Sequence, residues 1–201
     1  MKHKGAFMIV GYLVFSAIFL SFIPPEQQLG KWLRLIIFHG NLSVASLYLI
    51  YFTGILGVAY LVTSKAAFAY WCAELGLQSV VIWFIGTALS FVSMQVAWGG
   101  LLWNEPRTIA ALTITVLGAG KEYLLRSNSA KKRAYAWANL LFALAVVVIR
   151  YTLTSIMHPV NPIEQSESML IRLLPTVFLV ITFIFVILLA SWRLSQTKNL
   201  S

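Results

Sequence analysis

The chain has 201 residues, of which 60% are hydrophobic and 10% charged, and its mean hydropathy is +0.83. This composition is too apolar for a soluble domain and is typical of an integral membrane protein. The formal charge of +9 does not indicate nucleic-acid binding, because basic residues that collect in alternate loops of a membrane protein set its orientation. The single cysteine, Cys72, excludes an internal disulfide, a Cys-x-x-Cys redox pair and a cysteine zinc cluster.

Six apolar segments follow one another along the chain, each near the roughly 20 residues with which a helix crosses a bilayer. The first resembles a signal peptide, but Ile23-Pro24-Pro25 is not a small-residue cleavage site, so we interpret it as a retained span. We therefore predict an all-α integral membrane protein with a single domain over residues 1–201. The predicted spans are about 5–23, 35–62, 75–94, 109–124, 135–157 and 169–192.

The loops between these segments differ in charge, and the most basic connector is predicted at Lys121–Arg133. With both termini on one side of the membrane, that side receives ten of the fifteen Lys and Arg residues, and the positive-inside rule makes it cytoplasmic. The opposite, outer side then receives most of the acidic residues and the two histidines of the spans. The ten basic residues are Lys2, Lys4, Lys65, Lys121, Arg126, Lys131, Lys132, Arg133, Arg193 and Lys198.

Tryptophan, glycine and charge cluster in the stretch Met94–Thr108, MQVAWGGLLWNEPRT, as nowhere else in the chain. One interpretation is an interfacial loop over 95–108, because tryptophans are enriched where a bilayer meets water and Gly and Pro mark turns. The other interpretation is a binding platform on the outer face.

Two histidines, His39 and His158, are predicted at matching depth near the outer ends of the second and fifth segments. Taken singly, a histidine in a span is often a structural residue bonded to a neighbouring helix. Together, beside an aromatic loop, they suit the axial positions of haem iron, while basic residues pair with the propionates. The outer face therefore favours a flat anionic macrocycle. Basic residues on or near that side are Arg34, Arg107, Arg150 and Arg172.

The segment WGGLLWNEPR, residues 98–107, resembles the tryptophan-rich (WWD) signature of the haem-handling proteins of cytochrome c maturation, the CcmC-like cytochrome c assembly family. Aligned without a gap from Trp98 and Gly99, Glu105 falls on the family aspartate and Arg107 on its basic residue. The sequence departs from the signature at three places: Leu102 and Asn104 fall on family tryptophans, and Trp103 is one place out of register.

Two further elements resemble the same family. The run Arg34–His39 is similar to the R-x-x-x-x-H element at the start of the family's second helix, and His158 stands where its other histidine lies. The resemblance implies a protein of a bacterial or archaeal cytoplasmic membrane that binds haem b on the outer face, with His39 and His158 as the metal ligands. The implied haem-binding residues besides these are Trp98, Gly99, Trp103, Glu105, Arg107 and Arg34.

The resemblance also implies that the chain delivers haem to a haem chaperone or apocytochrome c during cytochrome c biogenesis. Such a protein is an assembly factor of the haem-lyase type rather than a turnover enzyme. An ABC-type exporter complex and membrane lipid are further candidate partners. The alternative is a small membrane permease or scaffold subunit without haem, in which the loop is an interfacial anchor and the histidines are structural.

Arg150 lies outside these motifs, eight residues before His158. On a straight helix this separation amounts to about 12 Å of depth and about 80° of rotation, so both side chains are predicted to line one haem cavity. The alternative is that Arg150 snorkels to the near interface.

Overall fold

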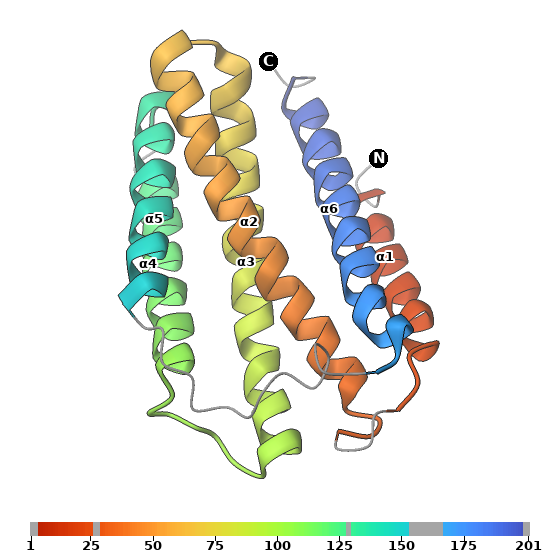
Figure 1. The fold of residues 1–201 in the computed structure, drawn as a ribbon. Coiled ribbons are helices and arrows are strands. Elements are labelled where there is room, and N and C mark those ends of the chain that lie inside the picture. Colours follow the sequence, from red (N-terminus) through yellow and green to blue (C-terminus); the bar gives the residue numbers. More distant parts are fainter. Residues whose placement is uncertain (1–3, 26–28, 128–129, 153–166, 199–201) are drawn as a thin grey trace.

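The computed structural model describes residues 4–25, 29–127, 130–152 and 167–198. These residues form six α-helices and no β-strand (Figure 1). Each helix is long and apolar enough to cross a membrane, which confirms the prediction of an all-α chain with six apolar helices. The helices are α1 (Lys4–Ser21), α2 (Leu33–Thr63), α3 (Ala66–Trp98), α4 (Pro106–Ser127), α5 (Lys132–Thr152) and α6 (Met169–Lys198).

The helices α2 and α3 form an antiparallel hairpin with a connection of only Ser64 and Lys65. Ser64 adopts the left-handed conformation, with φ of 55°, and its N–H donates to the Tyr60 carbonyl, which ends α2. Helix α3 begins at Ala66, before the predicted start of the third span at residue 75. Hydropathy marks the segment suited to the bilayer, whereas the helix itself continues beyond that segment toward the hairpin.

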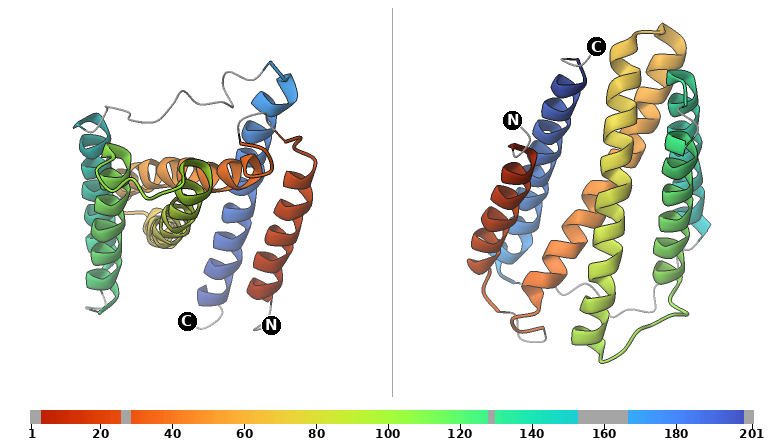
Figure 2. Two further views of the ribbon diagram at one scale, coloured as in Figure 1. Left: turned by 90° about the horizontal axis from the view of Figure 1, so that it is seen from below. Right: turned by 180° about the vertical axis from the view of Figure 1, so that it is seen from behind.

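Helices α2 and α3 form the centre of the bundle, with α4 and α5 on one side and α1 and α6 on the other (Figures 1 and 2). Of the described helices, α1 contacts α6 and α2. Helix α1 begins and α6 ends at the same end of the bundle as the α2–α3 hairpin (Figure 1). We call this the hairpin end, and the opposite end, which carries the connection between α3 and α4, the loop end.

Small residues allow α2 to approach α3 and α5 closely, as is common between helices in membranes. A Cβ added at Gly57 would lie 2.6 Å from the Ala136 carbonyl oxygen of α5. A Cβ added at Gly86 would lie 2.8 Å from Ser43 Oγ of α2. The main apolar cluster then fills the space between α2, α3, α4 and α5. Its buried members are Leu47, Ile50, Val80, Trp83, Ile114, Phe142, Ala143 and Val146.

Aromatic stacking holds α1 against α6. The Tyr12 ring lies 4.2 Å from the Phe185 ring, and the Tyr12 hydroxyl shares a 2.8 Å hydrogen bond with Thr182. Nearer the loop end, the Phe19 and Phe178 rings are 5.5 Å apart. These contacts join the first helix to the last, so α1 and α6 pack together as one flank of the bundle.

Two further predicted segments differ in their bounds from the observed ones. The predicted loop 95–108 is shorter, because α3 continues through Trp98 and α4 begins at Pro106. The fourth helix continues beyond the predicted span 109–124 at both ends, from Pro106 to Ser127. The basic connector was predicted to begin at Lys121, and this bound is wrong because Lys121 lies in α4 with its side chain buried. The fifth helix is described to Thr152, and the rest of the predicted span to residue 157 lies outside the described residues.

Candidate functional site at the loop end

The connection between α3 and α4 displays two tryptophans. Gly99 ends α3 in the left-handed conformation, with φ of 72°, and its N–H donates to the Gln95 carbonyl at 3.1 Å. Trp98 and Trp103 are 42% and 57% exposed, and the Trp103 ring lies 5.5 Å from the Phe91 ring of α3. Both indoles are therefore accessible from outside the bundle, as an interfacial anchor and a binding platform each require.

A buried polar layer lies beneath these tryptophans. Glu105, directly before α4, is 1% exposed, and Thr108 Oγ1 lies 3.9 Å from Met94 Sδ of α3. Ser93 is 2% exposed, and its hydroxyl has no hydrogen-bond partner among the described residues. Arg107, by contrast, is exposed, so the two charged residues of the resemblance occupy different environments.

His39 lies in the loop-end half of the α2–α3 interface. Ser43 Oγ donates to the His39 carbonyl at 2.9 Å, and a Cβ added at Gly86 of α3 would lie 3.6 Å from that carbonyl. The His39 Nδ1 atom is buried and has no hydrogen-bond partner among the described residues. Buried ring nitrogens are normally hydrogen-bonded, and a neutral imidazole offers one nitrogen as a metal ligand.

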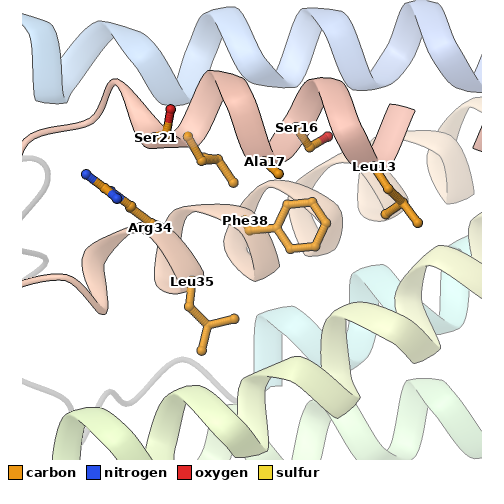
Figure 3. Close-up of a pocket in the computed structure, with 8 residues that line it drawn as sticks. Leu13, Ser16, Ala17, Ser21, Arg34, Leu35 and Phe38 are labelled. Atoms are coloured by element: carbon orange, nitrogen blue, oxygen red, sulfur yellow. The ribbon is translucent and has the colours of Figure 1, made fainter. Parts of the chain in front are cut away.

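Arg34 belongs to a different face of α2 from His39. Five residues separate them, which corresponds to about 140° around the helix. The Arg34 Nε donates to the Ile23 carbonyl at 3.1 Å, and the side chain lines a groove between α1 and α2 (Figure 3). The structure therefore does not bring Arg34 and His39 together on one surface.

The remaining predicted site residues are distributed as follows. Arg150 is exposed in the last turn of the described part of α5, an orientation that fits snorkelling to the near interface. His158 lies outside the described residues, so its pairing with His39 stays a prediction. Arg172 is exposed near the start of α6, at the loop end. Within the described part of the chain, no group of three or more His, Cys, Asp or Glu residues is placed to hold a metal ion.

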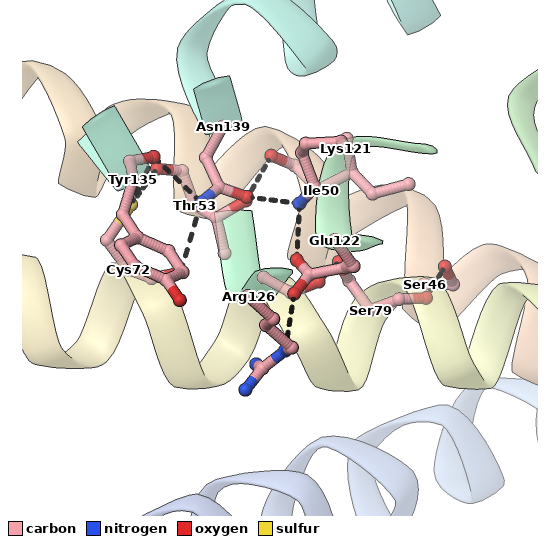
Figure 4. Close-up of polar contacts among 11 residues, drawn as sticks. Ser46, Ile50, Thr53, Cys72, Ser79, Lys121, Glu122, Arg126, Tyr135 and Asn139 are labelled. Carbon is pink, nitrogen blue, oxygen red and sulfur yellow. Dashed lines mark hydrogen bonds and ion pairs between the residues drawn. The ribbon is translucent and has the colours of Figure 1, made fainter. Parts of the chain in front are cut away.

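A buried charged cluster toward the hairpin end was not singled out from the sequence (Figure 4). Lys121 Nζ donates to Asn139 Oδ1 of α5 at 2.7 Å and lies 2.9 Å from Glu122 Oε1. Glu122 Oε2 lies 3.1 Å from Arg126 Nε. The Lys121 and Glu122 side chains are each 8% exposed. The sequence contained one indication of this cluster, which is Asn139 inside the predicted fifth span. Polar residues in membrane spans normally face the bundle interior, where they have partners.

A second ion pair lies on the opposite side of α3. Glu74 Oε1 lies 3.2 Å from Arg193 Nε of α6 and accepts a 2.9 Å hydrogen bond from Gln78 Nε2. Cys72, on the same helix as Glu74, is buried. Its Sγ lies 3.4 Å from the Thr53 carbonyl oxygen. An ion pair thus connects α3 to α6, and the hydrogen bond from Lys121 to Asn139 connects α4 to α5, toward the hairpin end.

The loop end offers one imidazole with a buried Nδ1, an accessible aromatic surface and exposed cations. The hairpin end instead has ion pairs between oppositely charged side chains. In comparison with known proteins, no family model and no curated protein sequence matches the chain.

Proposed function

We propose that the chain is an integral membrane protein that binds haem b at the loop end through His39 and His158 and passes it to a haem chaperone or apocytochrome c. The observation that carries the proposal is the buried Nδ1 of His39, which lacks a hydrogen-bond partner among the described residues. An unpaired polar atom in an apolar interior costs about 1 to 3 kcal/mol, so a partner is expected. Coordination of a metal is one way in which an imidazole gains such a partner.

The surroundings of His39 support this role. The Ser43 hydrogen bond and the close approach of α3 at Gly86 fix the backbone of His39, which pre-sets the position of its ring. Exposed Trp98 and Trp103 supply aromatic surface at the same end of the bundle. Arg107 is exposed there and is suited to a propionate. In this arrangement the residues of the chain bind and orient the macrocycle, and the bound iron supplies the coordination chemistry.

We further propose that the hairpin end faces the cytoplasm and that the loop end faces the outside of the cell. The hairpin end carries Lys65 between α2 and α3 and the basic start of α5 at Lys132 and Arg133. Basic residues in short loops are retained on the cytoplasmic side. The haem site and the tryptophan loop then lie on the outer face.

Reporter fusions test this orientation. Fusions at Lys65, Asn128 and the C-terminus should read cytoplasmic, whereas fusions at Gln27, Asn104 and Gln165 should read external, with an alkaline phosphatase and fluorescent protein pair as reporters. An external reading at Asn128 would overturn the proposed orientation, because a short loop with several basic residues rarely crosses the membrane.

An absorption spectrum tests the haem proposal. The protein purified in mild detergent should show a Soret band, and a His39→Ala, His158→Ala double variant should lose it. His3→Ala is the matched control, because it removes the third histidine of the chain and should leave the band unchanged. A colourless protein that also fails to bind added haemin would contradict the proposal.

The single variants separate ligation from folding. His39→Gly should retain less haem, and added imidazole should restore the band by occupying the vacated ligand position. Loss of haem without rescue, together with a lower melting temperature, would show that His39 supports the fold instead of binding iron.

A small permease without haem is the second candidate, and the buried Lys121–Glu122–Asn139 cluster favours it. Ionisable groups inside membrane helices often mark ion or substrate pathways. A folded protein that lacks haem and loses ligand-dependent transport on replacement of Glu122 would support this candidate.

A further inference from the structure

An open groove runs between α1 and α2 in the loop-end half of the bundle (Figure 3). Its volume is about 370 Å³. The groove exists because α1 leans on α6 and presents small side chains, such as Ser16 and Ala17, toward α2. Its apolar wall consists of Leu13, Ala17, Leu20, Leu35 and Phe38.

The length of the groove matches one leaflet of a bilayer. Along α1 it extends from Leu13 to Ser21, a separation of eight residues that corresponds to about 12 Å. Half of a typical hydrocarbon core is about 15 Å. Buried Ile23 and Leu33 hold the helix ends together just beyond the groove. The apolar groove on the flank of the bundle is therefore about as long as one leaflet of the hydrocarbon core is thick.

One cationic side chain, that of Arg34, lies at the loop-end opening of this groove. Arg34, the second residue of α2, is partly buried, and its Nε–H bond to the Ile23 carbonyl fixes the guanidinium beside the groove. Among the described residues, no carboxylate forms an ion pair with it. A guanidinium carries five N–H donors in a rigid fork that matches phosphate geometry.

We infer that this groove binds an anionic phospholipid of the surrounding bilayer, with an acyl chain along the apolar wall and the phosphate on Arg34. The charge of Arg34 selects an anionic headgroup, and its place at the helix end puts it level with the headgroup region. The groove and the His39 face lie on different sides of α2, so the lipid site is independent of haem binding.

Native mass spectrometry of the full chain in detergent tests the site, with phosphatidylglycerol and phosphatidylcholine as the two added lipids. The unaltered protein should retain phosphatidylglycerol preferentially. Arg34→Gln should reduce that preference about tenfold, because it removes the cation that attracts the net negative headgroup. Ala17→Leu, which fills the groove and leaves the charge in place, should reduce the adducts of both lipids.

Arg172→Gln is the matched control, because Arg172 is an exposed arginine at the same end of the bundle but outside the groove. It should leave the preference unchanged, and an equal loss in this variant would overturn the site in favour of general surface charge. Equal binding of the two lipids by the unaltered protein, or unchanged adducts in folded Arg34→Gln or Ala17→Leu, would also overturn it. The His39→Ala protein should keep the lipid preference, which separates this outcome from failure of the haem proposal.

Discussion

Replacing Lys121 by Met is expected to lower the free energy of unfolding by about 3 to 5 kcal/mol, because it breaks a buried ion pair from one side. Met keeps most of the length and apolar volume of the lysine stem. It removes the ammonium that pairs with Glu122 and donates to Asn139. Glu122 is then left buried with only Arg126 beside it, and Asn139 Oδ1 loses a charged donor. Unfolding in mixed detergent micelles, followed by circular dichroism, measures the change.

Two further variants serve as comparisons for the Lys121→Met measurement. Arg126 forms the partly exposed arm of the cluster, at 46% exposure, so Arg126→Ala should cost at most about 1 kcal/mol. The double variant Lys121→Met, Glu122→Gln removes both charges and should recover part of the loss, because no uncompensated charge stays buried. Additive losses in the double variant would contradict a direct pairing of the two side chains.

Gly57→Ala is expected to destabilise the bundle by about 1 to 3 kcal/mol through overpacking. The added Cβ would lie 2.6 Å from the Ala136 carbonyl oxygen and 3.3 Å from its carbon, both backbone atoms of α5. No side-chain rotation relieves such a contact, so α2 and α5 must separate. The melting temperature in detergent should therefore fall.

Gly40→Ala on the same helix should have the opposite effect. No atom lies within 4 Å of a Cβ added at Gly40, and alanine is the better helix former by up to about 1 kcal/mol. The pair of variants thus separates helix propensity from interhelix contact. Equal and small changes in melting temperature for Gly57→Ala and Gly40→Ala would show that α2 and α5 are not in close contact at Gly57.

The six helices were predictable because hydropathy reports directly on segments that suit a bilayer, as it did for α1, α2 and α6. Hydropathy did not reveal the parts of the helices that contain charged residues. Lys121 and Glu122 fell within the predicted basic connector, because Asn139, the hydrogen-bond partner of Lys121, belongs to another helix. Helix α3 begins before the predicted third span for a related reason, because the segment before Leu75 includes Glu74, which pairs with Arg193 of α6.

The candidate site was predictable in its parts but not in its arrangement. The spacing of Arg34 and His39 already places them about 140° apart on a helix. Which neighbour each one meets depends on where α1 and α3 pack, and this is decided by contacts distant in sequence. The exposure of Trp98 and Trp103 agrees with both interpretations of the loop. The burial of Glu105 so close to exposed Arg107 was not visible from the sequence.

The stacking of α1 on α6 sets an order for biosynthesis. Tyr12 and its partner Thr182 are separated by 170 residues, so the first helix leaves the ribosome long before its main neighbour exists. At translation rates of about 5 to 20 residues per second, α1 waits roughly 10 to 30 s for α6. During that interval its aromatic face is available to lipid, to the insertion machinery or to another newly made chain. The contact between α1 and α6 therefore forms late in synthesis, and the last helix controls when the first one reaches its final place.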